Sequence, residues 1–117
     1  MPDPQIASLP EPPYYAVIFT SRRRGADAGY DAMADEMARL AAIQPGYLGH
    51  ESARDAAGFG ITVSYWRDAA AIRAWKAEVR HLAAQRLGHA RWYADYAVRV
   101  ARVGRAYHRE NSAISAP

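Results

Sequence analysis

Residues 60–93, GITVSYWRDAAAIRAWKAEVRHLAAQRLGHARWY, contain the pattern that decides the fold. In the first part of this stretch, side chains of two kinds alternate, which is typical of a β-strand with two unlike faces. One face carries Ile61, Val63 and Tyr65, and the other carries Thr62, Ser64 and Trp66. The alternation predicts a strand over residues 59–67, but it does not decide which face lies against helices.

A helix is predicted directly after this strand, with almost no connecting loop. Asp68 is one of the residue types that cap a helix N-terminus. Apolar residues then recur at steps of three and four, which is the period of one helix face. They are Ile72, Trp75, Val79 and Leu82. The helical pattern weakens at Leu87 and Gly88, and a short helical turn is expected over residues 89–92.

The rest of the chain predicts three more strands and one more helix. Residues 14–21, YYAVIFTS, favour a strand buried on both faces, and Tyr47–Arg54 favours a weaker strand that forms a hairpin with residues 59–67. Residues 96–105, YAVRVARVGR, alternate valine with small and basic residues and predict the last strand. The first helix is indicated by an N-cap, an apolar face and a stop, namely Asp27, then Tyr30, Met33, Met37 and Leu40, then Gln44-Pro45-Gly46.

The predicted order, βαββαβ, is the ferredoxin-like α+β layout. We expect an irregular N-terminal arm over residues 1–12, which hold four of the seven prolines, a single domain over residues 13–108, and a flexible tail over residues 109–117. The helices should cover one face of a four-stranded antiparallel sheet and leave the other face bare. An apolar sheet face is rarely left in water, so we predict a homodimer through the open sheet face.

Composition excludes several classes of protein. The chain of 117 residues is long enough for one domain and has no cysteine, which excludes disulfides and thiolate chemistry. No apolar run approaches the roughly 18–20 residues of a membrane span, and the acidic, proline-rich N-terminus does not resemble a signal peptide. The net charge of +3 comes from scattered arginines, among them Arg22, Arg23 and Arg24 in an expected loop. We therefore expect a cytoplasmic protein that binds neither nucleic acid nor membrane.

The chain resembles the antibiotic biosynthesis monooxygenase family over residues 13–107. The resemblance rests on YYAVIFTS, MARLAAIQPGYLGHES, GITVSYWRDAAAIRAWK and WYADYAVRVARV. It implies a dimeric α+β barrel with a pocket between the helices and the sheet of each subunit. It also implies oxidation of a phenolic small molecule without metal or flavin, so no cofactor is expected. Haem-degrading relatives carry a histidine ten residues after the tryptophan that Trp75 matches, and Gln85 occupies that position here, which argues against haem degradation.

Candidate site residues follow from this grouping of aromatic and polar side chains. His81, with Tyr93 or Tyr96, would orient and deprotonate a hydrophobic small molecule. The residues expected to bind that molecule are Trp66, Trp75, Trp92, Gln85 and Tyr65. Tryptophans at such spacing also build ordinary cores, and a small-ligand-binding homodimer without catalysis remains the alternative.

The placement of His81 depends on the continuity of its helix. On one unbroken helix, His81 lies opposite the apolar stripe, and a break near Val79 and Arg80 would turn it inward. The four histidines show no metal-ligand spacing, so no metal site is expected. Arg99 or Arg102 on the last strand either pairs with an acid such as Glu51 or faces the rim of the sheet.

Overall fold

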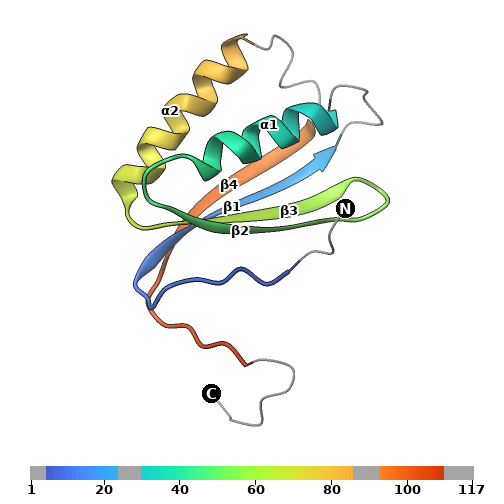
Figure 1. Ribbon diagram of the computed structural model, residues 1–117. Coiled ribbons are helices and arrows are strands. Elements are labelled where there is room, and N and C mark those ends of the chain that lie inside the picture. Colours follow the sequence, from blue (N-terminus) through green and yellow to red (C-terminus); the bar gives the residue numbers. More distant parts are fainter. Residues whose placement is uncertain (1–4, 24–29, 86–92, 110–117) are drawn as a thin grey trace.

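The computed structural model describes residues 5–23, 30–85 and 93–109 and shows a ferredoxin-like α+β fold (Figure 1). The described elements are β1 (Tyr14–Arg23), α1 (Tyr30–Ala42), β2 (Tyr47–Arg54), β3 (Phe59–Trp66), α2 (Ala69–Gln85) and β4 (Tyr93–Val103). The strands form one sheet in the order β2-β3-β1-β4, and every neighbouring pair is antiparallel. The fold class predicted from the sequence is confirmed.

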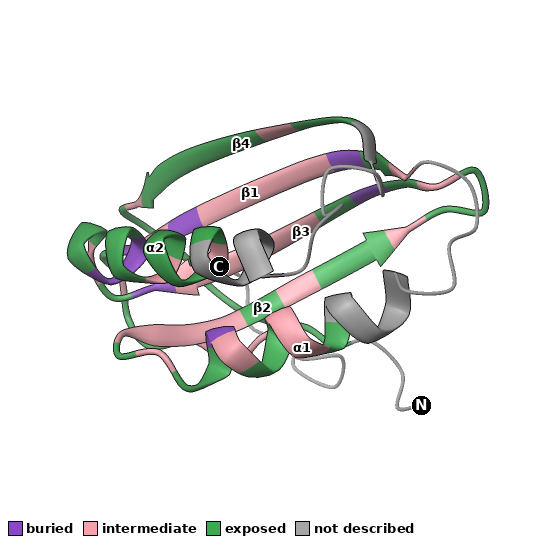
Figure 2. Cartoon of the chain, turned by 90° about the horizontal axis from the view of Figure 1, so that it is seen from above, coloured by how far each residue is buried: buried purple, intermediate pink, exposed green. Residues whose placement is uncertain are grey.

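Both helices lie on the same side of the sheet (Figure 1). We call the side that carries them the helix-side face and the opposite side the open face. Seen from above, α1 lies near β2 and α2 lies at one end of the sheet, whereas β4 forms the far edge (Figure 2). The helix-side residues Tyr96, Val98 and Val100 of β4 are each more than half exposed. The helices therefore cover the β2–β3 part of the helix-side face more fully than its β4 edge.

The position of Trp66 shows which face of β3 lies beneath the helices. This side chain is fully buried and packs with Ala41 of α1 and with Ala71 and Ile72 of α2. Half-buried side chains of β1, β2 and α2 complete the cluster, namely Tyr15, Val17, Tyr47 and Trp75. The Thr62–Ser64–Trp66 set thus lies beneath the helices, and the Ile61–Val63–Tyr65 set lies on the open face.

The first turn of α2 packs closely against the start of β2. Gly46 has φ +87°, and a Cβ built there would lie 2.6 Å from the Cβ of Ala71. The amide of Arg67 donates to the Gly46 carbonyl at 2.8 Å. Asp68 caps the helix as predicted, because its Oδ1 accepts the Ala71 amide at 2.8 Å. Only glycine, which lacks a Cβ and tolerates positive φ, fits position 46.

A part of the open face is covered by the chain's own N-terminal segment. The amide of Ala7 donates to Glu51 Oε2 at 3.0 Å, and Leu9 Cδ2 lies 3.4 Å from where a Cβ on Gly49 would stand. Near this end of the open face Tyr14 is buried and meets the ring of Tyr65 edge-on, with centroids 5.8 Å apart. Sequence reasoning anticipated an irregular arm but not its contact with the sheet.

Several predicted boundaries differ from the structure. Arg22 and Arg23 were expected in a loop, yet they belong to β1, where they pair with β4 and extend the strand beyond residue 21. β4 begins at Tyr93 rather than at Tyr96 and ends at Val103 rather than at residue 105. The predicted cap at Asp27 and the predicted helical turn over residues 89–92 lie outside the described residues. Within the described residues, no helix is both long and apolar enough to cross a membrane.

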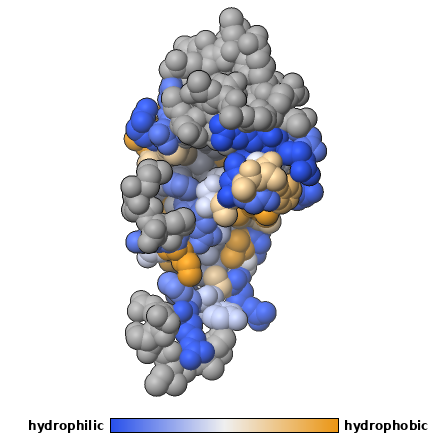
Figure 3. Space-filling view, turned by 90° about the vertical axis from the view of Figure 1, so that its right-hand side faces the viewer, coloured by the Kyte–Doolittle hydropathy of each residue, from blue (hydrophilic) through white to orange (hydrophobic). Residues whose placement is uncertain are grey.

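The surface at the end where β2 turns into β3 is mixed in character. Figure 3 views the molecule from that side and shows apolar surface as separate patches among hydrophilic surface. On the open face, Phe59 and Ile61 of β3 are 40% and 42% exposed. The part of the open face beyond the N-terminal segment therefore keeps large apolar side chains in contact with solvent.

Candidate functional site

A row of hydroxyl groups crosses the helix-side face of the sheet. Antiparallel register places Ser21 beside Gly60, Ser52 beside Thr62, and His50 beside Ser64. Ser52 Oγ and Thr62 Oγ1 lie 2.7 Å apart and share a hydrogen bond. We call Ser21, Ser52, Thr62 and Ser64 the hydroxyl row. Groups of this kind can fix the orientation of a ligand that carries hydroxyl or carbonyl oxygens.

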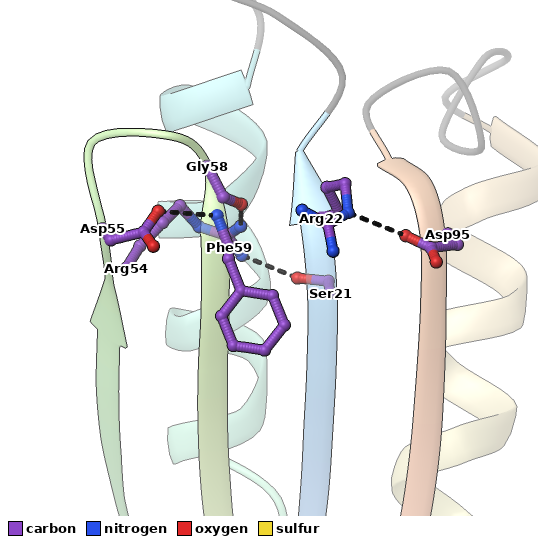
Figure 4. Close-up of polar contacts among 7 residues, drawn as sticks. All are labelled: Ser21, Arg22, Arg54, Asp55, Gly58, Phe59 and Asp95. Carbon is purple, nitrogen blue, oxygen red and sulfur yellow. Dashed lines mark hydrogen bonds and ion pairs between the residues drawn. The ribbon is translucent and has the colours of Figure 1, made fainter.

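A guanidinium lies at one end of the hydroxyl row. Arg54 of β2 reaches across β3, donates from Nη2 to Ser21 Oγ at 2.7 Å and donates from Nη1 to the Gly58 carbonyl (Figure 4). A Cβ on the intervening Gly60 would lie 2.7 Å from Arg54 Cζ, so glycine opens the path for this side chain. Ser21 is buried, and the Arg54 contact satisfies its hydroxyl group.

Stacked aromatic rings lie at the other end of the row. The indoles of Trp66 and Trp75 stack with centroids 5.8 Å apart and an interplanar angle of 23°. Tyr47 meets Trp66 edge-on at 5.5 Å. The indole N–H of Trp66 donates to Ser64 Oγ at 2.9 Å, which satisfies the buried nitrogen. The structure therefore brings Trp66 and Trp75 together, with Trp66 in the core and Trp75 half-buried.

The β4 edge of the helix-side face supplies an exposed apolar surface. Tyr96 lies opposite Ser21 in register, and its ring lies 5.6 Å from the ring of Phe19. Val98 and Val100 continue the same face along β4. Among the residues predicted to be catalytic, Tyr96 has a described side chain. It lies beside the hydroxyl-bearing Ser21 and the ring of Phe19, and it is exposed to solvent.

Tyr65 lies on the opposite face from Trp66. Its hydroxyl donates to Glu51 Oε1 at 2.6 Å on the open face. Burial, followed by the hydrogen bond to Glu51, raises the pKa of Tyr65 far above its usual range. The hydrogen bond from Tyr65, with that from the Ala7 amide, lowers the pKa of Glu51. The structure does not bring Tyr65 together with the two tryptophans, because successive residues of a strand point to opposite faces.

The other predicted site residues are described through the backbone or not at all. His81 and Gln85 lie in α2, and Tyr93 begins β4, but their side chains lie outside the described part of the chain, as does the whole of Trp92. α2 is continuous over Val79 and Arg80, where an inward His81 would need a break. The roles expected of these residues stay predictions.

Sequence reasoning missed two features of this site. Ser21, Ser52 and Arg54 were not singled out, and Thr62 was assigned to a strand face but to no role. His50 was counted only among the four histidines without metal-ligand spacing, and its ring shares a hydrogen bond with the Tyr47 hydroxyl. Strand register, which brings these residues side by side, is a property of the folded sheet.

The suggested pairing of Glu51 with Arg99 or Arg102 is wrong. Glu51 is on β2 at one edge of the sheet and the arginines are on β4 at the other, with β3 and β1 between them. Both arginines are exposed, as expected for charged side chains at the rim. In the residues that the structure describes, no cluster of three or more acidic or histidine side chains could hold a metal ion.

Comparison with known proteins places the chain in a family. Residues 13–87 match the antibiotic biosynthesis monooxygenase domain, and the chain belongs to this family. It is 53% identical over 100 residues to YqjZ of Bacillus subtilis (strain 168), an uncharacterized protein, with 86% of this chain and 88% of YqjZ covered. The family expected from the sequence is confirmed.

Solved structures share the fold at low sequence identity. SnoaB from Streptomyces nogalater, a cofactor-independent oxygenase whose mutant was crystallised, superposes with a TM-score of 0.62 at 17% identity, covering 85% of this chain and 97% of SnoaB. The NE2512 protein of unknown function from Nitrosomonas europaea superposes with a TM-score of 0.61 at 11% identity over 85% and 97% of the two chains. These similarities show the fold.

Proposed function

We propose that this protein is a cofactor-independent monooxygenase that acts on a hydrophobic phenolic molecule. The observation that supports the proposal most is the helix-side face, where the hydroxyl row lies between stacked tryptophans and the exposed apolar surface of β4. A flat aromatic ligand needs apolar contact for its rings and a few polar groups for its oxygens. Family membership and the activity named for SnoaB agree with this function.

The reaction needs no reductant besides the substrate. Removal of a proton from a phenolic or benzylic position gives an electron-rich anion that can pass an electron to dioxygen. In an anthrone, the methylene carbon becomes a carbonyl: one oxygen atom enters the product and the other leaves as water with the two hydrogens. The protein has to hold the substrate, accept the first proton and keep the anion oriented.

The proposed roles follow the positions of the side chains. Tyr96 would donate a hydrogen bond to a substrate oxygen, with Phe19 and Val98 against the ring system. Trp75, which stacks on buried Trp66, would contact the aromatic rings from the helix side. His81 and Tyr93, with Trp92 and Gln85, remain candidates for proton transfer and contact from the chain around the α2–β4 connection.

Oxygen uptake with a panel of anthrones and hydroquinones tests the proposal. We expect uptake by the parent and a loss of about a hundredfold in Tyr96→Phe, since a positioned hydrogen-bond donor contributes on this scale. A parental rate in His81→Ala would leave His81 without a role. Tyr107→Phe and His108→Ala are matched controls, because both residues are exposed beyond the end of β4. Absence of uptake with every substrate would refute the enzyme.

A non-catalytic ligand-binding protein is the second candidate, favoured by the same apolar surface. Quenching of tryptophan fluorescence by an anthraquinone, without oxygen uptake from the corresponding anthrone, would establish this candidate.

We propose further that the protein is a homodimer whose subunits pack through the open face. Phe59 and Ile61 expose large apolar areas there, and Ile18 and Val63 continue the surface toward β1 and along β3. Isologous packing of two such faces would remove this surface from water. Light scattering at micromolar concentration measures the assembly directly.

A further inference from the structure

A β-bulge in β2 brings two side chains to one face that regular alternation would separate. Along a regular strand, residues three apart point to opposite faces. The pairing of β2 with β3 moves from Tyr47–Trp66 to Gly49–Tyr65, so β2 has one residue more than its partner at this point. Tyr47 and His50 therefore both lie on the helix-side face. Bulges are frequent next to active sites, where they redirect a side chain.

The two redirected side chains form a hydrogen-bonded pair. Tyr47 Oη and His50 Nδ1 lie 2.7 Å apart. The Tyr47 ring is fixed edge-on against Trp66, while the His50 side chain is exposed. Burial raises the pKa of Tyr47, so its hydroxyl keeps its proton at neutral pH. The pair thus combines an anchored phenol with an imidazole that a ligand can reach.

The carboxylate next to His50 in sequence does not bind the imidazole. Glu51 points to the open face, where it accepts hydrogen bonds from the Tyr65 hydroxyl and the Ala7 amide. On the helix side, His50 lies opposite Ser64, and the Ser52–Thr62 hydroxyl pair follows directly along the two strands. The imidazole therefore stands at the hydroxyl row proposed to orient substrate oxygens.

We propose that the His50–Tyr47 pair accepts the proton of a phenolic ligand bound at the hydroxyl row. The inference rests on the proposed function and assigns its base to a residue pair that sequence reasoning did not consider for this role. In the tautomer that this role requires, Nδ1–H of His50 donates to Tyr47 Oη and Nε2 has a free lone pair. The O–H bond of the ligand breaks and its proton moves to Nε2 of His50. The ring becomes an imidazolium, the ligand becomes a phenolate, and Tyr47 stays a neutral phenol that positions Nδ1.

Binding of 4-nitrophenol tests the proton transfer without any turnover. At a pH just below the pKa of free 4-nitrophenol, addition of the parent protein should raise the absorbance of the phenolate. His50→Ala should abolish this rise, and Tyr47→Phe, which keeps the ring on Trp66, should reduce it. His108→Ala is the matched control and should behave as the parent. Unchanged near-ultraviolet circular dichroism shows that each variant is folded.

Oxygen uptake provides the second measurement. We expect His50→Ala to lose about a hundredfold or more of the parent rate, and added imidazole to restore a part of it. A residue with a purely structural role would not be rescued by free imidazole.

The outcomes separate the two proposals. The role of the pair is overturned if the parent forms no phenolate, or if the parent and His50→Ala form equal amounts. A parental rate of oxygen uptake in His50→Ala also overturns it. Phenolate that depends on His50, without oxygen uptake by the parent, supports the pair as a proton acceptor and refutes the oxygenase.

Discussion

At the scale of single residues, Trp66 shows how a buried aromatic side chain depends on one polar neighbour. Its indole is fully buried, and its N–H has Ser64 Oγ as hydrogen-bond acceptor. A buried donor without a partner costs free energy because it has lost its bond to water. Ser64 therefore stabilises the centre of the core although it is only a small polar residue on a strand.

Ser64→Ala should lower the free energy of unfolding by about 1–3 kcal/mol, since the indole N–H of Trp66 would stay buried and unsatisfied. Denaturant unfolding followed by tryptophan fluorescence measures the change. Ser52→Ala is the control: its hydroxyl pair with Thr62 is exposed and water can replace it, so a change within about 0.5 kcal/mol is expected. Equal effects of the two substitutions would contradict this role of Ser64.

Gly46→Ala should destabilise the protein by about 2 kcal/mol or more. The residue has φ +87°, which strains a residue with a Cβ, and the new methyl group would meet Ala71 of α2. Thermal unfolding provides the measurement. Gly104→Ala is the matched control, because its Cβ would meet only the flexible end of the Arg102 side chain. A parental melting temperature for Gly46→Ala would show that α2 can shift without cost.

At the scale of elements, α2 begins without a loop because Asp68 caps it directly after β3. The hydrogen bond from the Ala71 amide lowers the pKa of the Asp68 carboxyl group, and the nearby arginines lower it to a smaller extent. A carboxylate whose pKa is lower in the folded state stabilises the fold above its unfolded-state pKa. This stabilisation is lost as the pH falls through the folded-state value.

Asp68→Ala should therefore lower the melting temperature at neutral pH, and the difference from the parent should shrink as the solution is acidified below the usual range of an aspartate pKa. Asp68→Asn is the control, since an amide caps the helix but does not titrate. Thermal unfolding over a pH series provides the test. A constant difference between the parent and Asp68→Ala at all pH values would show that the charge has no part in the cap.

At the scale of the whole molecule, the two faces of the sheet carry different groups of side chains. The helix-side face holds the core, the hydroxyl row and the His50–Tyr47 pair. The open face is covered in part by the N-terminal segment through Glu51 and Gly49 and keeps Phe59 and Ile61 exposed beyond it. Arg22 lies over the Phe59 ring, with its guanidinium carbon 5.6 Å from the centroid, at the same end of this face. An assembly through this face leaves the helix-side face free for a ligand.

Ile61→Arg should convert the proposed dimer into a monomer, because a charged side chain would be buried between two sheets without a partner. Light scattering of the parent and the variant at the same micromolar concentration measures this change. Ile43→Arg is the matched control, since Ile43 is largely exposed at the end of α1, away from the open face. A monomeric parent, or a dimeric Ile61→Arg, would contradict assembly through this face.

Much of the fold was predictable because alternation and helical period are local properties of the chain. The two sets of side chains on β3, the cap at Asp68 and the order of elements were confirmed. The ends of β1 and β4 were misplaced, since the pairing of Arg22 with Asp95 that extends both strands joins distant parts of the sequence. The placement of Tyr65 away from Trp66 followed from the same alternation.

The sequence by itself determined the strand and helix pattern, the family and the two faces of each strand, because neighbouring side chains suffice to define them. The tertiary structure alone decided that the Trp66 face meets the helices and that Arg54 crosses Gly60 to Ser21. It also decided, through the bulge in β2, that His50 and Tyr47 meet on one face. Register between strands arises from the packing of distant segments, so residues that lie far apart in the chain or point apart in a regular strand become neighbours only after folding.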